Sequence, residues 1–276
     1  INALESAAEV ANIKASELLI DQLSNTEISD YSSKLLLIAA GKSSNIEILN
    51  LLLKLNLTID DSQYEVIEAA LETGNPEIVK KLFEIGFVLP TQSYALESLL
   101  WSTFKYNKSY QFKHPTQLFN LLKLNGLVFS NIEEKDRSIL MSRVYTFAHA
   151  AWVDIDKNNA NLESAMRYKQ SVMALTQTYI NQVNSIDFQY GRKNQTLLMN
   201  AVAGNLPEVV ELILHHKPNL ELKNKKDQSA LDIATQEARI YILGSRKDFA
   251  QIYKTNAQKI VSLLGGDISI FKGMIK

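Results

Sequence analysis

The stretch NQTLLMNAVAGNLPEVVELIL, residues 194–214, decides the fold. Its apolar residues follow helical spacing twice, first around Leu198 and again around Val209. Thr196 stands where a helix N-cap belongs, and Pro207 stands where a second helix would begin, a place where proline's missing N–H costs nothing. The stretch therefore predicts two short helices joined by a tight link.

Both helices of this stretch recur along the chain. DQSALDIA (227–234) aligns with NQTLLMNA (194–201) at a spacing of 33 residues, and GNPEIVKKLF (74–83) aligns with the second-helix phrase NLPEVVELIL. Weaker copies of the second helix occupy 45–52, 115–122 and 259–264. Short helices of this kind need neighbours to bury their apolar faces. The spacing predicts about six units, at 31–60, 61–90, 91–130, 136–186, 187–222 and 223–266.

These phrases resemble the ankyrin repeat. Thr196 and Ser229 take the place of its first-helix threonine, and alanines at 40, 70, 201 and 234 match its small residues. The chain departs from the family where Leu197 replaces the usual proline and Met199 the usual histidine, and most glycines of the finger loops are missing. The resemblance implies an all-α, ankyrin-type helical-repeat solenoid that binds proteins through its fingers and first helices.

The repeat also suggests how the chain is divided. We expect residues 1–30 to form an N-terminal cap or linker, with one helix over 2–24, and residues 31–276 to form the repeat domain. Extra residues at roughly 98–114 and 235–256 read as insertions, and the unit at 136–186 has lengthened helices, about 138–152 and 160–184.

Composition excludes several classes of protein. Glycine and proline together number only 15 of 276 residues, too few for a typical β-sandwich or glycine-rich nucleotide-binding fold. The chain has no cysteine and a net charge of −1. We therefore expect no cofactor, no metal, no nucleic-acid partner and no membrane insertion, and we place the protein in the cytosol of a cell. The sequence shows no motif of a catalytic site, which favours a non-enzyme.

The positions that the repeat does not need are the candidates for function. Aromatic residues mixed with cations are typical of interface anchors. The third-unit insertion, the finger before the fifth unit and the last insertion supply such residues: Trp101, Phe104, Tyr106, Tyr110, Phe112, Phe188, Tyr190, Arg192, Lys193, Tyr241, Arg246, Lys247 and Phe249.

A basic cluster, Lys217, Lys223, Lys225 and Lys226, covers the turn between the last two units. It could bind phosphate or an acidic partner, but a solvated loop is the favoured interpretation, because Glu221 and Asp227 flank it.

The favoured function is a protein–protein interaction module. The degenerate, Lys-, Asn- and Ile-rich, cysteine-free repeats resemble those of ankyrin effectors that intracellular bacteria such as Legionella deliver into host cells, which implies a host protein as partner. Two alternatives stay open. The segment could position substrate for a catalytic domain upstream of Ile1, or residues 91–186 could form an embedded helical subdomain with its own ligand pocket.

Overall fold

The fold was obtained as a computed structural model. It describes residues 1–23, 28–58, 60, 63–105, 115–158, 162–189, 191–236 and 247–272, and within these it describes no side chains for 149–158, 162–166 and 247–252. The regular elements of the described residues are helices, as the sequence predicts. The chain divides into two compact units, Ile1–Ile132 and Glu133–Lys276.

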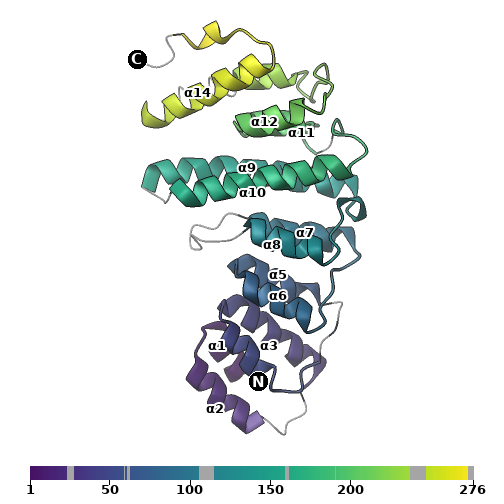
Figure 1. Ribbon diagram of the computed structural model, residues 1–276, viewed down its shortest axis with the longest axis vertical. Helices are drawn as coiled ribbons and strands as arrows, with labels where there is room; N and C mark the ends of the chain where they lie inside the picture. Colours follow the sequence, from purple (N-terminus) through teal and green to yellow (C-terminus); the bar gives the residue numbers. More distant parts are fainter. Residues whose placement is uncertain are drawn as a thin grey trace. The chain divides into compact units, whose positions relative to one another are not determined.

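The N-terminal unit consists of paired helices stacked in two rows (Figure 1). The first helices of the pairs, α1, α3, α5 and α7, pack against one another in order, and the second helices, α2, α4, α6 and α8, do the same. The elements are α1 (Asn2–Glu9), α2 (Ile13–Leu23), α3 (Asp30–Ser43), α4 (Ile46–Leu52), α5 (Tyr64–Thr73), α6 (Pro76–Glu84), α7 (Ser93–Phe104), α8 (Pro115–Leu124) and the 3-10 helix η1 (Phe129–Asn131).

Local sequence explains where each pair turns. The α5 helix ends at Gly74, whose φ of 84° lies in the left-handed region that glycine adopts readily. The side chain of Asn75 then accepts a hydrogen bond from the backbone N–H of Glu77 at 2.9 Å, and Pro76 takes the first helical position of α6. An N-cap and proline thus begin the second helix where the sequence predicts it.

Hydrogen bonds between neighbouring pairs repeat the period of the sequence. Asn75 Nδ2 donates to the carbonyl of Ser44 at 3.0 Å, and the two residues are 31 apart. Lys34 and Glu65, also 31 apart, form an ion pair at 2.7 Å. The α3 and α5 backbones approach closely at Gly41, where an added Cβ would lie 3.1 Å from the backbone nitrogen of Ala70. Equivalent positions of successive repeats therefore contact one another directly.

The C-terminal unit has the same order of packing. Its elements are α9 (Glu134–Asn158), α10 (Leu162–Gln182), α11 (Leu197–Ala203), α12 (Pro207–Leu214), a helix beginning at residue 230, α14 (Lys247–Leu263) and the 3-10 helix η2 (Ile268–Phe271). The α9 helix packs on α10 and α11, while α12 packs on α10, α11 and α14 (Figure 1). A buried hydrogen bond of 2.9 Å between the hydroxyls of Tyr145 and Thr176 joins α9 to α10.

Two expectations about organisation differ from the structure. The single helix expected over 2–24 is two helices, because the chain turns at Ala11, whose φ is 55°. Since α1 packs on α3 and α2 on α4, this segment is a further helix pair of the N-terminal unit. The range 91–186 is also shared between the two compact units, so the alternative of one embedded subdomain there loses its support.

Candidate interaction surfaces

The residues predicted from the third-unit insertion have different environments. Phe104 is fully buried and meets Phe119 edge to face, with ring centroids 5.6 Å apart. Its assignment to an exposed surface is therefore wrong, because it completes the core between α7 and α8. Trp101 is half-buried on α7. Tyr106, Tyr110 and Phe112 lie outside the described residues.

The other predicted contact residues belong to the C-terminal unit. Arg192 and Lys193 are exposed, and Phe188 is half-buried. Tyr190, Tyr241 and Arg246 lie outside the described residues, and the same holds for the side chains of Lys247 and Phe249 at the start of α14. The structure thus brings Arg192 and Lys193 together on one loop and leaves the remaining assignments as predictions.

The loops before α11 and before the helix at 230 each contain a tight turn. The backbone N–H of Asn194 donates to the carbonyl of Gly191 at 3.1 Å, and that of Asp227 donates to the carbonyl of Asn224 at 3.0 Å. Asn194 and Asp227 have φ values of 54° and 60°. Asparagine and aspartate tolerate this left-handed conformation better than most residues, so they replace the glycines that the ankyrin pattern expects.

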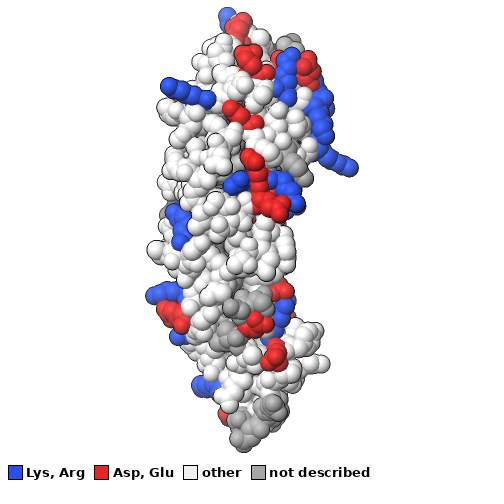
Figure 2. Space-filling model, turned by 90° about the vertical axis from the view of Figure 1, so that its right-hand side faces the viewer, with Lys and Arg blue, Asp and Glu red and all other residues white. Residues whose placement is uncertain are grey.

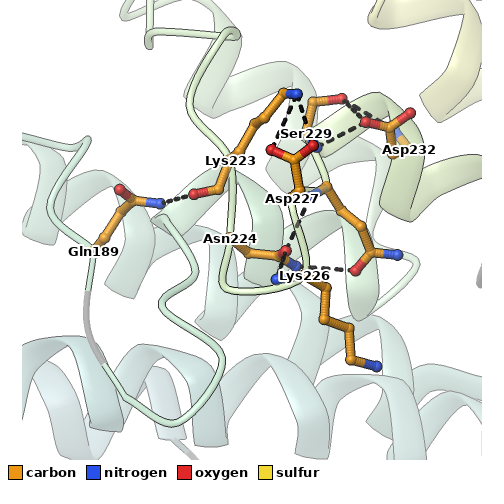
Figure 3. Close-up of polar contacts among 8 residues, drawn as sticks. Gln189, Lys223, Asn224, Lys226, Asp227, Ser229 and Asp232 are labelled. Carbon is orange, nitrogen blue, oxygen red and sulfur yellow. Dashed lines mark hydrogen bonds and ion pairs between the residues drawn. The ribbon is translucent and has the colours of Figure 1, made fainter.

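Asn224 organises the second turn from within. Its side chain is largely buried, and its Oδ1 accepts hydrogen bonds from the backbone N–H groups of Lys226 at 2.8 Å and Gln228 at 3.1 Å. Its Nδ2 donates to Oε1 of Gln228 at 3.1 Å (Figure 3). A buried amide with both ends bonded fixes the shape of the turn.

Backbone and amide hydrogen bonds join the two turns to each other. The N–H of Lys225 donates to the carbonyl of Lys193 at 3.0 Å. Gln189 Nε2 donates to the carbonyl of Asn194 at 3.0 Å and to that of Lys223 at 2.8 Å, so one side chain bridges both loops. Figure 3 shows the hydrogen bond to Lys223. We call the two turns, residues 191–194 and 224–227, the paired turns.

Three acidic groups near the paired turns, Asp187, Asp227 and Asp232, are already engaged. Both carboxylate oxygens of Asp187 accept from the N–H of Asn219, at 3.0 and 3.1 Å, and Asp227 pairs with Lys223 at 3.1 Å. Asp232 accepts from the backbone N–H of Ser229 at 2.8 Å and from its hydroxyl at 2.7 Å, and these hydrogen bonds lower the pKa of its carboxyl. Figure 2, which faces the side toward which the connecting loops project, shows cationic and anionic side chains close together at its top.

A second surface was missed by sequence reasoning. Tyr31, Tyr64 and Tyr94 stand in the first turns of α3, α5 and α7, and we call them the tyrosine row. Tyr31 is 71% exposed and Tyr94 is 63% exposed. The rings of Tyr64 and Tyr94 meet edge to face, with centroids 6.3 Å apart. The 30-residue spacing of Tyr64 and Tyr94 was the available signal, because Ala40 and Ala70 have the same spacing and equivalent repeat positions share one face. Tyr31 lies about one helical turn before the α3 position that is equivalent to Tyr64.

Polar contacts between neighbouring repeats join the first helices that carry the tyrosine row. On α5, Glu65 pairs with Lys34 of α3, and Glu72 pairs with Lys105 after α7 at 3.2 Å. Glu68 accepts a hydrogen bond from the hydroxyl of Ser98. Partial burial of Tyr64, followed by the charges of Glu65 and Glu68, raises the pKa of its hydroxyl, so the group stays neutral at physiological pH.

Trp101 extends the tyrosine row along α7. It lies seven residues after Tyr94, which places both side chains on one face of the helix about two turns apart. Among the described residues, no group of three or more His, Asp or Glu side chains is placed to hold a metal ion. No described helix combines the length and the apolar character needed to cross a bilayer.

Comparison with known proteins identifies the fold. No protein-family model matches the chain. The ankyrin repeat domain of human ASB11 is 17% identical, with a TM-score of 0.53, over 83% of this chain and 90% of that one. That likeness shows the ankyrin-repeat fold and confirms the all-α, ankyrin-type prediction.

Two further solved structures have lower TM-scores. One is the predatory endopeptidase Bd0816 from Bdellovibrio bacteriovorus in complex with immunity protein Bd3460, with a TM-score of 0.36, 17% identity, and coverage of 96% of this chain and 97% of the matched chain. The other is the ankyrin repeat domain of Bcl-3, with a TM-score of 0.34, 14% identity, and coverage of 96% and 98%.

Proposed function

We propose that this chain is a protein–protein interaction module whose principal contact surface is the tyrosine row together with Trp101. The observation that carries the proposal is a set of large aromatic side chains in the first turns of three successive first helices, of which Tyr31 and Tyr94 are exposed and Tyr64 is half-buried. Tyrosine and tryptophan are enriched among residues that dominate binding energy, since they bury much area and lose few rotamers.

The burial pattern supports this assignment. In α5 the buried residues Val66, Ile67 and Ala70 face the core, so Tyr64 and the glutamates of that helix are left on the outer face. The exposed tyrosines contribute little to the core, whereas Leu36, Leu37 and Leu99 are fully buried and sustain the stack. A large aromatic residue at a position the fold does not require is typical of a binding surface.

We also propose that the partner is a host protein and that the chain is the ankyrin part of a bacterial effector. The support is the resemblance in composition and repeat degeneracy described above. A fusion of this protein to a translocation reporter tests the proposal. Transfer of the reporter into cultured host cells is expected, and retention in the bacterium would contradict it.

The contact surface is tested by substitution. A proteome-scale screen with the full chain as bait identifies binding proteins, and each one is then purified for calorimetry. The triple variant Tyr31→Ala, Tyr64→Ala, Tyr94→Ala is expected to lower the affinity for a true partner by about 100-fold or more. Each aromatic side chain is expected to contribute about 1–2 kcal/mol of binding free energy.

A matched control shows whether a loss of affinity comes from the tyrosine row itself or from removing any exposed apolar side chains. Leu18, Leu124 and Ile268 are 67%, 83% and 48% exposed and lie outside the tyrosine row. Their combined replacement by alanine is expected to leave the affinity within about twofold. Equal affinities of the tyrosine variant and the parent chain for every partner found would overturn the assignment of this surface.

A further inference from the structure

We propose that the paired turns of the C-terminal unit bind an acidic segment of a partner protein through Arg192, Lys193, Lys225 and Lys226. This inference rests on the proposed function, because it names the chemistry of a protein partner at a second surface. It revises the favoured interpretation of the basic cluster as a solvated loop.

The first observation is the position of the four cations. Arg192 and Lys225 are 33 residues apart, as are Lys193 and Lys226, so two successive repeats place a cationic pair at the same point of the same turn. All four side chains are exposed. The hydrogen bond from the N–H of Lys225 to the carbonyl of Lys193 brings the two pairs next to each other.

The second observation is that the carboxylates nearest the four cations do not pair with them. None of the four cations forms an ion pair with another of the described residues. The nearby carboxylates of Asp187, Asp227 and Asp232 are held by Asn219, Lys223 and Ser229 in turn. Four like charges therefore stand on adjacent turns of a chain whose net charge is −1. An external anion would relieve their repulsion.

The third observation is that the paired turns are preorganised. The buried amide of Asn224 and the bridging amide of Gln189 fix the backbone that carries the cations (Figure 3). A ligand then binds without the free-energy cost of ordering the loops. Arg192 adds the planar fork that binds a carboxylate through two parallel hydrogen bonds.

The charge pattern favours an acidic peptide over a nucleic acid. Nucleic-acid binding depends on many phosphate contacts along a continuous basic surface. Here Glu221 is exposed beside the paired turns, and Asp232 follows them in the chain. A regular phosphate backbone would meet these carboxylates, whereas a peptide can place neutral residues opposite them.

The test measures binding of the full chain to defined probes by fluorescence anisotropy at about 50 mM salt, where screening is weak. The acidic probe is a labelled peptide of about twelve residues with glutamate at alternate positions; its glutamine analogue and an oligothymidine of equal length complete the set. We expect the acidic peptide to bind best, and to bind less tightly as salt rises.

The decisive variant replaces Arg192, Lys193, Lys225 and Lys226 with glutamine. This variant should bind the acidic peptide with an affinity at least about tenfold lower than that of the parent chain. A control with glutamine at Lys14, Lys54, Lys80 and Lys123, exposed lysines of the N-terminal unit, changes the net charge equally and should stay within twofold of the parent chain. Exchanging arginine and lysine at the four cationic positions should retain most of the affinity, because the charges remain.

Three results would overturn the inference: no preference for the acidic peptide over its glutamine analogue, equal losses in the two glutamine variants, or tighter binding of oligothymidine. Failure here is distinguishable from failure of the proposed function, because partner binding through the tyrosine row is measured with different variants in the N-terminal unit.

Discussion

Single residues in the left-handed region show how this chain manages with so few glycines. Lys217 has a φ of 51° at the end of the second helix, the place where Gly86 and Gly126 have positive φ in other repeats. A side chain in this conformation costs about 1 kcal/mol or more. The scarcity of glycine seen in the composition is thus met by Asn, Asp, Ser and Lys at strained turn positions.

We therefore predict that Lys217→Gly stabilises the protein. The free energy of unfolding should rise by about 0.5 kcal/mol. Glycine relieves the backbone strain of the folded state, and this gain exceeds the free energy by which its greater flexibility stabilises the unfolded chain. Urea denaturation measures the change. Lys226→Gly is the control, since Lys226 is equally exposed but has no positive φ, and it should destabilise slightly. If Lys217→Gly lowered the free energy of unfolding as much as Lys226→Gly, the backbone at Lys217 would not be strained.

A second residue-scale prediction concerns pH. The hydrogen bonds from Ser229 lower the folded-state pKa of Asp232 below its ordinary value of 3.8. The stabilisation is therefore present above the unfolded-state pKa and is lost as pH falls through the folded-state pKa. Because Asp232 is exposed, we expect an effect of only about a few tenths of a kcal/mol.

The measurement compares the parent chain with Asp232→Asn in urea at a series of pH values. The difference in free energy of unfolding should be constant near neutrality and shrink in acid. Ser229→Ala, which removes the hydroxyl donor, should reduce the pH-dependent part. A difference that grows on acidification would refute the assigned role.

At the scale of helices, close approach of α3 and α5 is the feature most sensitive to substitution. We predict that Gly41→Ala lowers the free energy of unfolding by about 1–3 kcal/mol, because overpacking outweighs the better helix propensity of alanine. The new methyl group would lie 3.1 Å from Ala70 N and 3.3 Å from Val66 O, both backbone atoms. Lys42→Ala, an exposed change on the same helix, should have a small effect on the urea midpoint. A stabilised Gly41→Ala variant would show that α3 and α5 do not approach this closely.

The helices also show what the sequence could predict and where it could not. Thr196 and Asn75 mark N-caps by residue type, so the two-helix unit was predictable. The break at Ala11 was harder to predict, because alanine is a strong helix former. Its one local signal was Asn12, whose Oδ1 accepts a hydrogen bond from the backbone N–H of Ala15 at 3.1 Å at the start of α2. Tertiary packing of α1 on α3 and α2 on α4 overrides the helix preference of alanine.

For the molecule as a whole, the repeat pattern indicated the surface that we propose for partner contact, and the count of aromatic residues did not. Aromatic residues near the third-unit insertion attracted attention because they are numerous, yet Phe104 fills the core. The tyrosine row was visible only as tyrosines near the start of three successive first helices, and the exposure of their side chains depends on which face of each helix turns outward. That orientation follows from packing within the N-terminal unit, which composition does not encode.

The most direct test of the tyrosine row as a contact surface is hydrogen–deuterium exchange on the full chain, with and without a protein partner found in the screen. The proposed contact surface predicts that binding slows exchange in the first turns of α3, α5 and α7, around Tyr31, Tyr64 and Tyr94. Exchange in the second helices α4 and α6 should change little. Protection confined to the second helices, with no change around the tyrosine row, would contradict the proposed function.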